Sequence, residues 1–250
     1  MPRPPTPKQI VGLTAFLLSI AFSALVVADH AGYVSVLDAE YRRDGFCVAD
    51  HATHGFNSFQ MCFIVDTLAC VILLSMKRAR GPFIVHTATI FFHGAYHFLQ
   101  YLFGLPLPRT LHLAAYTIFT LAYMFEFGIG VKVGSKGTLA LVTLAIVGVD
   151  YYLVPHPMSF AYTNGWIFAT ATISGMVTPP EKRDCYGASW PATLTLLLGG
   201  AVFPFCEAML CNRGVKALGG HAIFDAFLAA VTLISVASAD DRSATKSKSS

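Results

Sequence analysis

Histidines and a carboxylate recur at helical spacing inside stretches that are otherwise apolar. His86, His93 and His97 are separated by seven and four residues, which places them on one face of a helix. His221 and Asp225 are four residues apart and would also share a helix face. Imidazole nitrogens and carboxylate oxygens suit zinc, so two such helices facing each other predict a metal site. We name its predicted ligands, His93, His97, His221 and Asp225, the four-ligand cluster.

Three more ionisable residues, Asp66, His112 and Glu207, lie inside apolar stretches. Such residues are costly within a membrane and usually face the bundle interior or a cavity, so each is a functional candidate. For any single histidine the alternative is a hydrogen-bonded structural role. Haem is another alternative, with His97 paired to His112 or His93 paired to a histidine of the last apolar stretch. A carboxylate beside each pair is less typical of haem ligation.

The composition identifies the solvent around these stretches. Hydrophobic residues make up 55% of the 250-residue chain and charged residues 12%, about half the usual ~25% of a soluble domain. A soluble fold could not bury so much apolar surface, and a disordered chain would need low hydrophobicity. A net charge of +3 from scattered basic residues argues against nucleic acid as a partner. The predicted fold class is therefore all-α, a polytopic helical bundle whose main partner is the lipid bilayer.

Apolar runs long enough to cross a bilayer as helices, roughly 17–25 residues, predict eight spans. They are Ile10–Ala28, Asn57–Met76, Pro82–Gly104, Thr110–Val131, Thr138–Val154, Ser159–Val177, Pro191–Cys211 and Leu218–Ala237. A cytosolic N-terminus leaves only five of the 17 Lys and Arg residues on the far side, which fits the positive-inside rule. Both termini are then cytosolic. Most of the intramembrane ionisable residues fall in the half of the membrane away from the cytosol.

The first span can also be interpreted as a secretory signal peptide whose removal would leave seven spans. The length of its apolar core favours an uncleaved anchor. The chain then divides into a cytosolic N-terminus (1–9), a first span or signal anchor (10–28), a non-cytosolic loop (29–56), a seven-helix membrane core (57–237) and a polar cytosolic tail (238–250).

The polar tail contains two lysines near its end that resemble a targeting signal. Lys246 and Lys248 resemble the dilysine retrieval signal of endoplasmic reticulum membrane proteins. This resemblance predicts an endoplasmic reticulum or Golgi membrane. The alternative is a plain polar tail held at the cytosolic face by its charges.

The six cysteines give little sign of a disulfide framework. Cys47 and Cys211 fall on the non-cytosolic side or at its edge and form the one plausible pair, with two free thiols as the alternative. Cys62, Cys70 and Cys206 lie within predicted spans and are interpreted as packing residues.

The last two spans resemble those of alkaline ceramidases. The matching segments are Glu207–Cys211 and Gly220–Asp225, and upstream Thr89–His93 is similar to the Ser-x-x-x-His motif of the family. The order and direction of the motif-bearing spans also agree. The wider superfamily, which includes the progestin and adiponectin receptors, is described as having seven helices and an intramembrane zinc.

The resemblance implies a membrane hydrolase that cleaves a lipid amide or ester. The four-ligand cluster would bind zinc, with His97 as a fourth ligand or as a residue that orients the others. Zinc would lower the pKa of a water molecule and polarise the substrate carbonyl. Asp66 or Glu207 would take the proton from the attacking water, and Thr89 would steady the oxyanion. The sequence departs from the family at Asp225, where the family has a second histidine.

Other functions fit the same residues. A receptor or scaffold of this architecture would bind a lipid without hydrolysing it. A proton-coupled transporter or channel would use the histidines and carboxylates as a proton relay, although the two halves of the chain show no internal correspondence. A structural membrane subunit with buried polar pairs is the remaining alternative.

Overall fold

The computed structural model describes residues 7–76, 81–128, 136–177 and 190–248, and all regular structure in these ranges is helical. The long helices are α1 (Pro7–His30), α4 (Ser58–Ser75), α5 (Gly81–Phe103), α6 (Arg109–Gly128), α7 (Lys136–Leu153), α8 (His156–Val177) and α11 (Ala222–Lys248). The shorter elements are α2 (Ala39–Asp44), α3 (His51–His54), α9 (Trp190–Thr195), the π-helix η2 (Leu196–Val202), α10 (Phe203–Leu210) and the 3-10 helices η3 (Cys211–Arg213) and η4 (Lys216–Leu218). The all-helical fold agrees with the predicted class.

Within the described residues, three helical segments are long and apolar enough to cross a membrane. They are Leu13–His30, Ser58–Ser75 and Leu196–Arg213. Shorter apolar helices cover Ala140–Leu153 and Ala222–Ile234. These segments are compatible with a membrane protein. The count of eight spans goes beyond them and stays a prediction.

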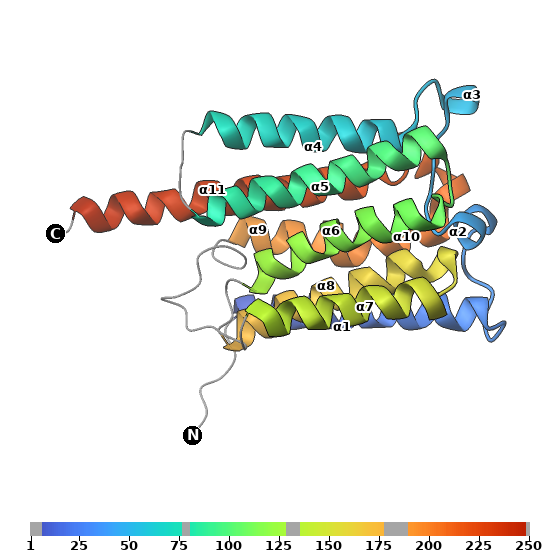
Figure 1. Cartoon of the computed structure of the whole chain (residues 1–250), viewed down its shortest axis with the longest axis horizontal. Coiled ribbons are helices and arrows are strands. Elements are labelled where there is room, and N and C mark those ends of the chain that lie inside the picture. The colour runs from blue at the N-terminus through green and yellow to red at the C-terminus, as the bar shows by residue number, and fades with distance from the viewer. Residues whose placement is uncertain (1–6, 77–80, 129–135, 178–189, 249–250) are drawn as a thin grey trace.

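The long helices run side by side, as Figure 1 shows. Helix α4 packs against α5 and α11, and α1 packs against α8 and η2. Two glycines permit close helix contacts. A Cβ on Gly94 of α5 would lie 2.8 Å from the Cβ of Asp66 on α4, and a Cβ on Gly199 of η2 would overlap the ring of Phe227 on α11. The start of α1 and the end of α11 lie at one end of the bundle, opposite α2 and α3.

The helix boundaries follow the predicted spans within a few residues, except at the last span. Its predicted start, Leu218, belongs to η4, and α11 begins only after Gly219 and Gly220, whose φ angles are 124° and 58°. These conformations favour glycine because a Cβ would be strained there. A Cβ on Gly220 would also overlap the carbonyl oxygen of Cys47. Helix α11 then continues to Lys248, so much of the predicted polar tail is helical.

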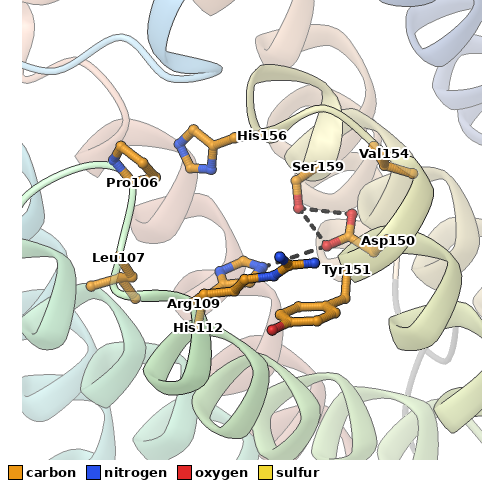
Figure 2. A pocket seen from close by; sticks show the side chains of 9 residues that line it. All are labelled: Pro106, Leu107, Arg109, His112, Asp150, Tyr151, Val154, His156 and Ser159. Atoms are coloured by element: carbon orange, nitrogen blue, oxygen red, sulfur yellow. Dashed lines mark hydrogen bonds and ion pairs between the residues drawn. The ribbon is translucent and has the colours of Figure 1, made fainter.

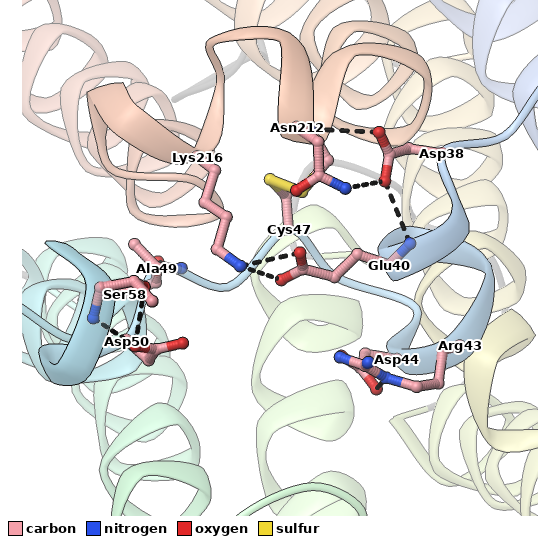
Figure 3. A network of polar contacts seen from close by, with 12 residues as sticks. Asp38, Glu40, Arg43, Asp44, Cys47, Ala49, Asp50, Ser58, Asn212 and Lys216 are labelled. Atoms are coloured by element: carbon pink, nitrogen blue, oxygen red, sulfur yellow. Dashed lines mark hydrogen bonds and ion pairs between the residues drawn. A yellow bond between two sulfur atoms is a disulfide. The ribbon is translucent and has the colours of Figure 1, made fainter.

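The predicted non-cytosolic loop is folded onto the end of the bundle (Figure 3). It contains α2 and α3, whose first turns are capped by the carboxylates of Asp38 and Asp50. Hydrogen bonds from Thr53 lower the pKa of Asp50. The Nζ atom of Lys216 lies 2.7 Å from both carboxylate oxygens of Glu40, which joins α2 to η4.

A disulfide between Cys47 and Cys211 fastens the same loop to the end of α10. This confirms the predicted pair over the alternative of two free thiols. Cys62, Cys70 and Cys206 carry free thiols, as expected for residues inside helices. Cys185 lies outside the described residues.

Candidate metal centre

Helices α5 and α11 bring the four-ligand cluster together in the interior. His93 and His97 lie one turn apart on α5, and their Nε2 atoms are 3.3 Å apart. His221 precedes α11 and Asp225 lies in its first turn. All four side chains are almost fully buried. The helical spacing in the sequence therefore places each pair on the face that points at the other pair.

The three imidazoles turn the same nitrogen toward the carboxylate of Asp225. The Nε2 atom of His97 lies 3.4 Å from Asp225 Oδ2. The Nε2 atoms of His93 and His221 lie 3.7 Å and 3.8 Å from Asp225 Oδ1. Neither carboxylate oxygen meets a hydrogen-bond partner among the described residues by distance and angle.

The other nitrogen of each ring, Nδ1, is held by an acceptor. Asp66 Oδ2 on α4 accepts a hydrogen bond from His93 at 2.9 Å. Glu207 Oε1 on α10 accepts one from His221, also at 2.9 Å. For His97, Oε1 of Gln100 is the acceptor at 2.6 Å, one turn further along α5. The list of acceptors is thus Asp66, Gln100 and Glu207, one for each imidazole.

With Asp66, Gln100 and Glu207 as acceptors, each ring carries its proton on Nδ1. A neutral imidazole that donates from Nδ1 has a lone pair and no proton on Nε2. The three Nε2 lone pairs would then point toward the buried carboxylate of Asp225, whose oxygens meet no hydrogen-bond partner among the described residues by distance and angle. Buried acceptors are normally satisfied, so this arrangement calls for a cation or for extra protons on the rings.

Several distances in the cluster are near those around a tetrahedral metal ion. Zinc bound to nitrogen or oxygen at ~2.0–2.1 Å in a tetrahedron separates neighbouring ligand atoms by about 3.3 Å. The His93 and His97 Nε2 atoms are 3.3 Å apart, His97 lies 3.4 Å from Asp225 Oδ2, and the other two rings lie 3.7 and 3.8 Å from Oδ1. Two groups have one ligand atom per residue within 4.8 Å of one another: Cys62, His97 and Asp225, and Asp66, His93 and Asp225. An acceptor behind each ring is also typical of metal-binding histidines, whose outer hydrogen bond fixes ring orientation.

Aromatic rings enclose the centre. Phe59 of α4 stacks on His97, with ring centroids 5.5 Å apart and an interplanar angle of 11°. His221 is surrounded by Phe46, Phe160 and Phe224, at centroid distances of 4.7, 5.1 and 5.3 Å. These apolar walls keep bulk water from the cluster, which strengthens electrostatic interactions inside it.

The peptide of Cys47 fixes the position of His221. Its N–H donates to Glu207 Oε1 at 2.9 Å, the same oxygen that accepts from His221. Its carbonyl oxygen accepts from the backbone N–H of His221 at 2.8 Å. The Cys47–Cys211 disulfide therefore lies next to the candidate metal centre.

A second polar group lies apart from the four-ligand cluster, between α6, α7 and α8 (Figure 2). His112 Nε2 is 3.5 Å from Asp150 Oδ2, and Ser159 Oγ lies 2.8 Å from both oxygens of that carboxylate. They line a pocket of about 260 Å³, where Arg109 stacks over Tyr151 at 4.5 Å. The ionisable residues that the sequence predicts within the helices thus form two separate groups in the structure, and their shared depth in the membrane stays a prediction.

The predicted site residues are placed as follows. The four-ligand cluster assembles as its spacing indicated, and Asp66 and Glu207 lie behind its rings. Thr89 is buried one turn before His93. Both nitrogens of His112 face groups other than His97, so the geometry does not favour the haem pair. The side chain of His86 lies outside the described residues.

Two residues at the candidate metal centre are not predicted from the sequence. Gln100 went unnoticed, although an amide three residues after His97 in an apolar helix was a usable signal. Cys62 was interpreted as a packing residue, yet its thiol lies beside Asp225 and His97. That contact joins different helices, and no local pattern reveals it.

Comparison with known proteins gives no relative: no protein-family model, curated protein or solved structure matches the chain.

Proposed function

We propose that this protein is a membrane-embedded hydrolase of a lipid amide or ester, with zinc held by the four-ligand cluster. The observation that carries the proposal is the convergence of three imidazole Nε2 lone pairs on Asp225, whose oxygens meet no hydrogen-bond partner among the described residues. The likeness to alkaline ceramidases in Thr89–His93, Glu207–Cys211 and Gly220–Asp225 supports the choice of reaction.

The residues around the centre have distinct proposed tasks. Bound zinc would lower the pKa of water toward about 7 and polarise the substrate carbonyl. Asp66 and Glu207 hold the rings of His93 and His221 in the orientation that exposes Nε2, instead of acting as the general base. Asp225 can use one oxygen as a ligand and keep the second to accept the proton of the attacking water. Thr89 remains the proposed hydroxyl donor to the oxyanion.

The surroundings support a lipid substrate. Apolar helices and the phenylalanine walls would admit an acyl chain from the bilayer more readily than a polar solute from water. We propose the eight-span arrangement with both termini in the cytosol and the centre in the outer half of an endoplasmic reticulum or Golgi membrane. The start of α1 and the end of α11 at one end of the bundle support this arrangement.

Metal content is the first test. Protein purified in detergent should contain about one equivalent of zinc by elemental analysis. The variants His93→Ala and His221→Ala should lose most of it because each removes a ligand, whereas His51→Ala, on exposed α3, should keep it. A wild-type protein that folds without metal would overturn the proposal and favour imidazoles that share protons with Asp225, as in a proton relay.

Hydrolysis is the second test. Zinc-loaded protein should release fatty acid from a ceramide or from an ester lipid in mixed micelles, and a chelator should stop the release. A metal-loaded protein that cleaves neither lipid would instead be a receptor or scaffold.

A further inference from the structure

One face of α4 is aimed at the candidate metal centre over successive turns. Phe59, Cys62 and Asp66 are three and four residues apart, so they share this face. Phe59 stacks on His97, and Asp66 accepts a hydrogen bond from His93. Cys62, between them, is fully buried.

The Cys62 thiol lies within ligand distance of two members of the four-ligand cluster, His97 and Asp225. Its Sγ and a ligand atom from each of His97 and Asp225 all lie within 4.8 Å of one another. By distance and angle the Asp225 oxygens meet no hydrogen-bond partner among the described residues, and the side chain is 0% exposed, so a buried carboxylate here can accept a cation. Thiolate sulfur is a preferred zinc ligand, at ~2.3 Å.

Another buried cysteine on α4 provides a contrast. The Sγ of Cys70 lies 3.6 Å from the carbonyl oxygen of Thr87, to which it donates. It packs in an apolar cluster with Ile90 and Ala229. Cys70 is an ordinary packing residue, whereas Cys62 faces charged and ring nitrogen groups.

We propose that the Cys62 thiolate is a fifth donor to the metal ion, an inference that rests on the proposed function. On metal binding, the thiol releases its proton to solvent, and no oxidation or reduction takes place. Three nitrogens, one carboxylate and one sulfur then compete for an ion that usually takes four ligands. A bound Cys62 thiolate would therefore compete with the attacking water for a place on the ion.

Cobalt(II) substitution tests the sulfur donor without any activity measurement. The apo-protein loaded with cobalt(II) should show visible bands from the bound metal and a near-ultraviolet thiolate-to-cobalt charge-transfer band. Cys62→Ser should keep the visible bands and lose the charge-transfer band. Cys70→Ser, the matched control on the same helix, should keep both.

The outcomes separate the two proposals. No bound metal in the wild type would overturn the proposed function and this inference together. Bound cobalt without a charge-transfer band, or a band that persists in Cys62→Ser, would overturn the sulfur donor alone. X-ray absorption of the wild-type zinc protein gives the same answer should the variant not fold: a sulfur shell at ~2.3 Å is expected, and a shell of nitrogen and oxygen only would contradict it.

Discussion

Each histidine of the candidate metal centre depends on the acceptor behind it. An imidazole can present Nε2 as a ligand only while Nδ1 keeps its proton, and Asp66 and Glu207 hold that proton for His93 and His221. Both acceptors are buried, so water cannot replace them. If the centre binds zinc as proposed, these carboxylates should set metal affinity as much as the rings do.

Exchanging these carboxylates for amides tests the point. We expect Asp66→Asn and Glu207→Gln to weaken zinc affinity by roughly 10–100-fold, because an amide can turn its NH₂ toward Nδ1 and reverse the tautomer. Competition with a fluorescent zinc chelator measures this. Asp44→Asn is the control, since Asp44 pairs with exposed Arg43 on the folded loop. Unchanged affinity in both buried variants would show that neither carboxylate orients a ligand.

At the scale of elements, α4 and α5 must approach closely for Asp66 to reach His93. Gly94 makes this possible, because a Cβ there would lie 2.8 Å from the Cβ of Asp66 and 3.3 Å from its Oδ2. A side chain at Gly94 would have to push the two helices apart. The close contact of α4 with α5, and with it the position of Asp66 beside His93, therefore depends on the absence of a side chain at Gly94.

Gly94→Ala should cost about 1–3 kcal/mol by overpacking and should also reduce zinc content. Gly148→Ala on α7 is the matched control, because a Cβ there meets nothing within 4 Å. It should stabilise the helix by about 0.5–1 kcal/mol, since alanine loses less backbone entropy than glycine. Thermal unfolding followed by elemental analysis measures both effects. Equal behaviour of the two variants would contradict the proposed link between helix spacing and the metal centre.

The folded loop is the second element on which the centre depends. Through the Cys47–Cys211 disulfide, which links residues 164 positions apart, the loop holds the Cys47 peptide against Glu207 and His221. Disulfides of this kind typically stabilise small domains by 2–5 kcal/mol. Its loss should affect the centre as well as the stability.

Reduction of this disulfide should lower both the unfolding temperature and the zinc affinity. The double variant Cys47→Ser with Cys211→Ser should behave like reduced wild type and should not respond further to the reductant. Zinc titration with and without reductant measures the difference. If affinity is the same in all forms, the hydrogen bonds of the Cys47 peptide suffice without the covalent link.

At the scale of the whole molecule, the proposed orientation places the folded loop on the side away from the cytosol. It places the C-terminal end of α11 on the cytosolic side. Asn57, Asn164 and Asn212 are the three asparagines, and none lies in an Asn-x-Ser/Thr sequence, so the chain has no glycosylation acceptor of its own. An acceptor in a flexible insertion beside exposed Tyr33 should therefore be glycosylated in microsomes. The same insertion after Ser250 should not be. The reverse pattern, seen as a glycosidase-sensitive mass shift on the C-terminal acceptor, would show that the orientation is wrong.

The sequence by itself determined the features that depend on local periodicity. Spacings of four residues fixed which side of α5 carries His93 and His97, because an α-helix repeats every 3.6 residues whatever surrounds it. The apolar composition fixed the all-helical class. The predicted side of the membrane for each cysteine singled out Cys47 and Cys211, which both fall on the non-cytosolic side or at its edge.

Only the tertiary structure decided which helices meet at the centre. The sequence indicates Asp66 and Glu207 as candidate bases, but the packing of α4 and α10 places them at Nδ1 of His93 and His221. The sequence indicates Cys62 as an ordinary packing residue, but the contact of α4 with α11 brings its thiol beside Asp225. The reason is physical: a helix fixes the angle of each side chain about its own axis, while the partner of that side chain depends on how all the helices fill space together.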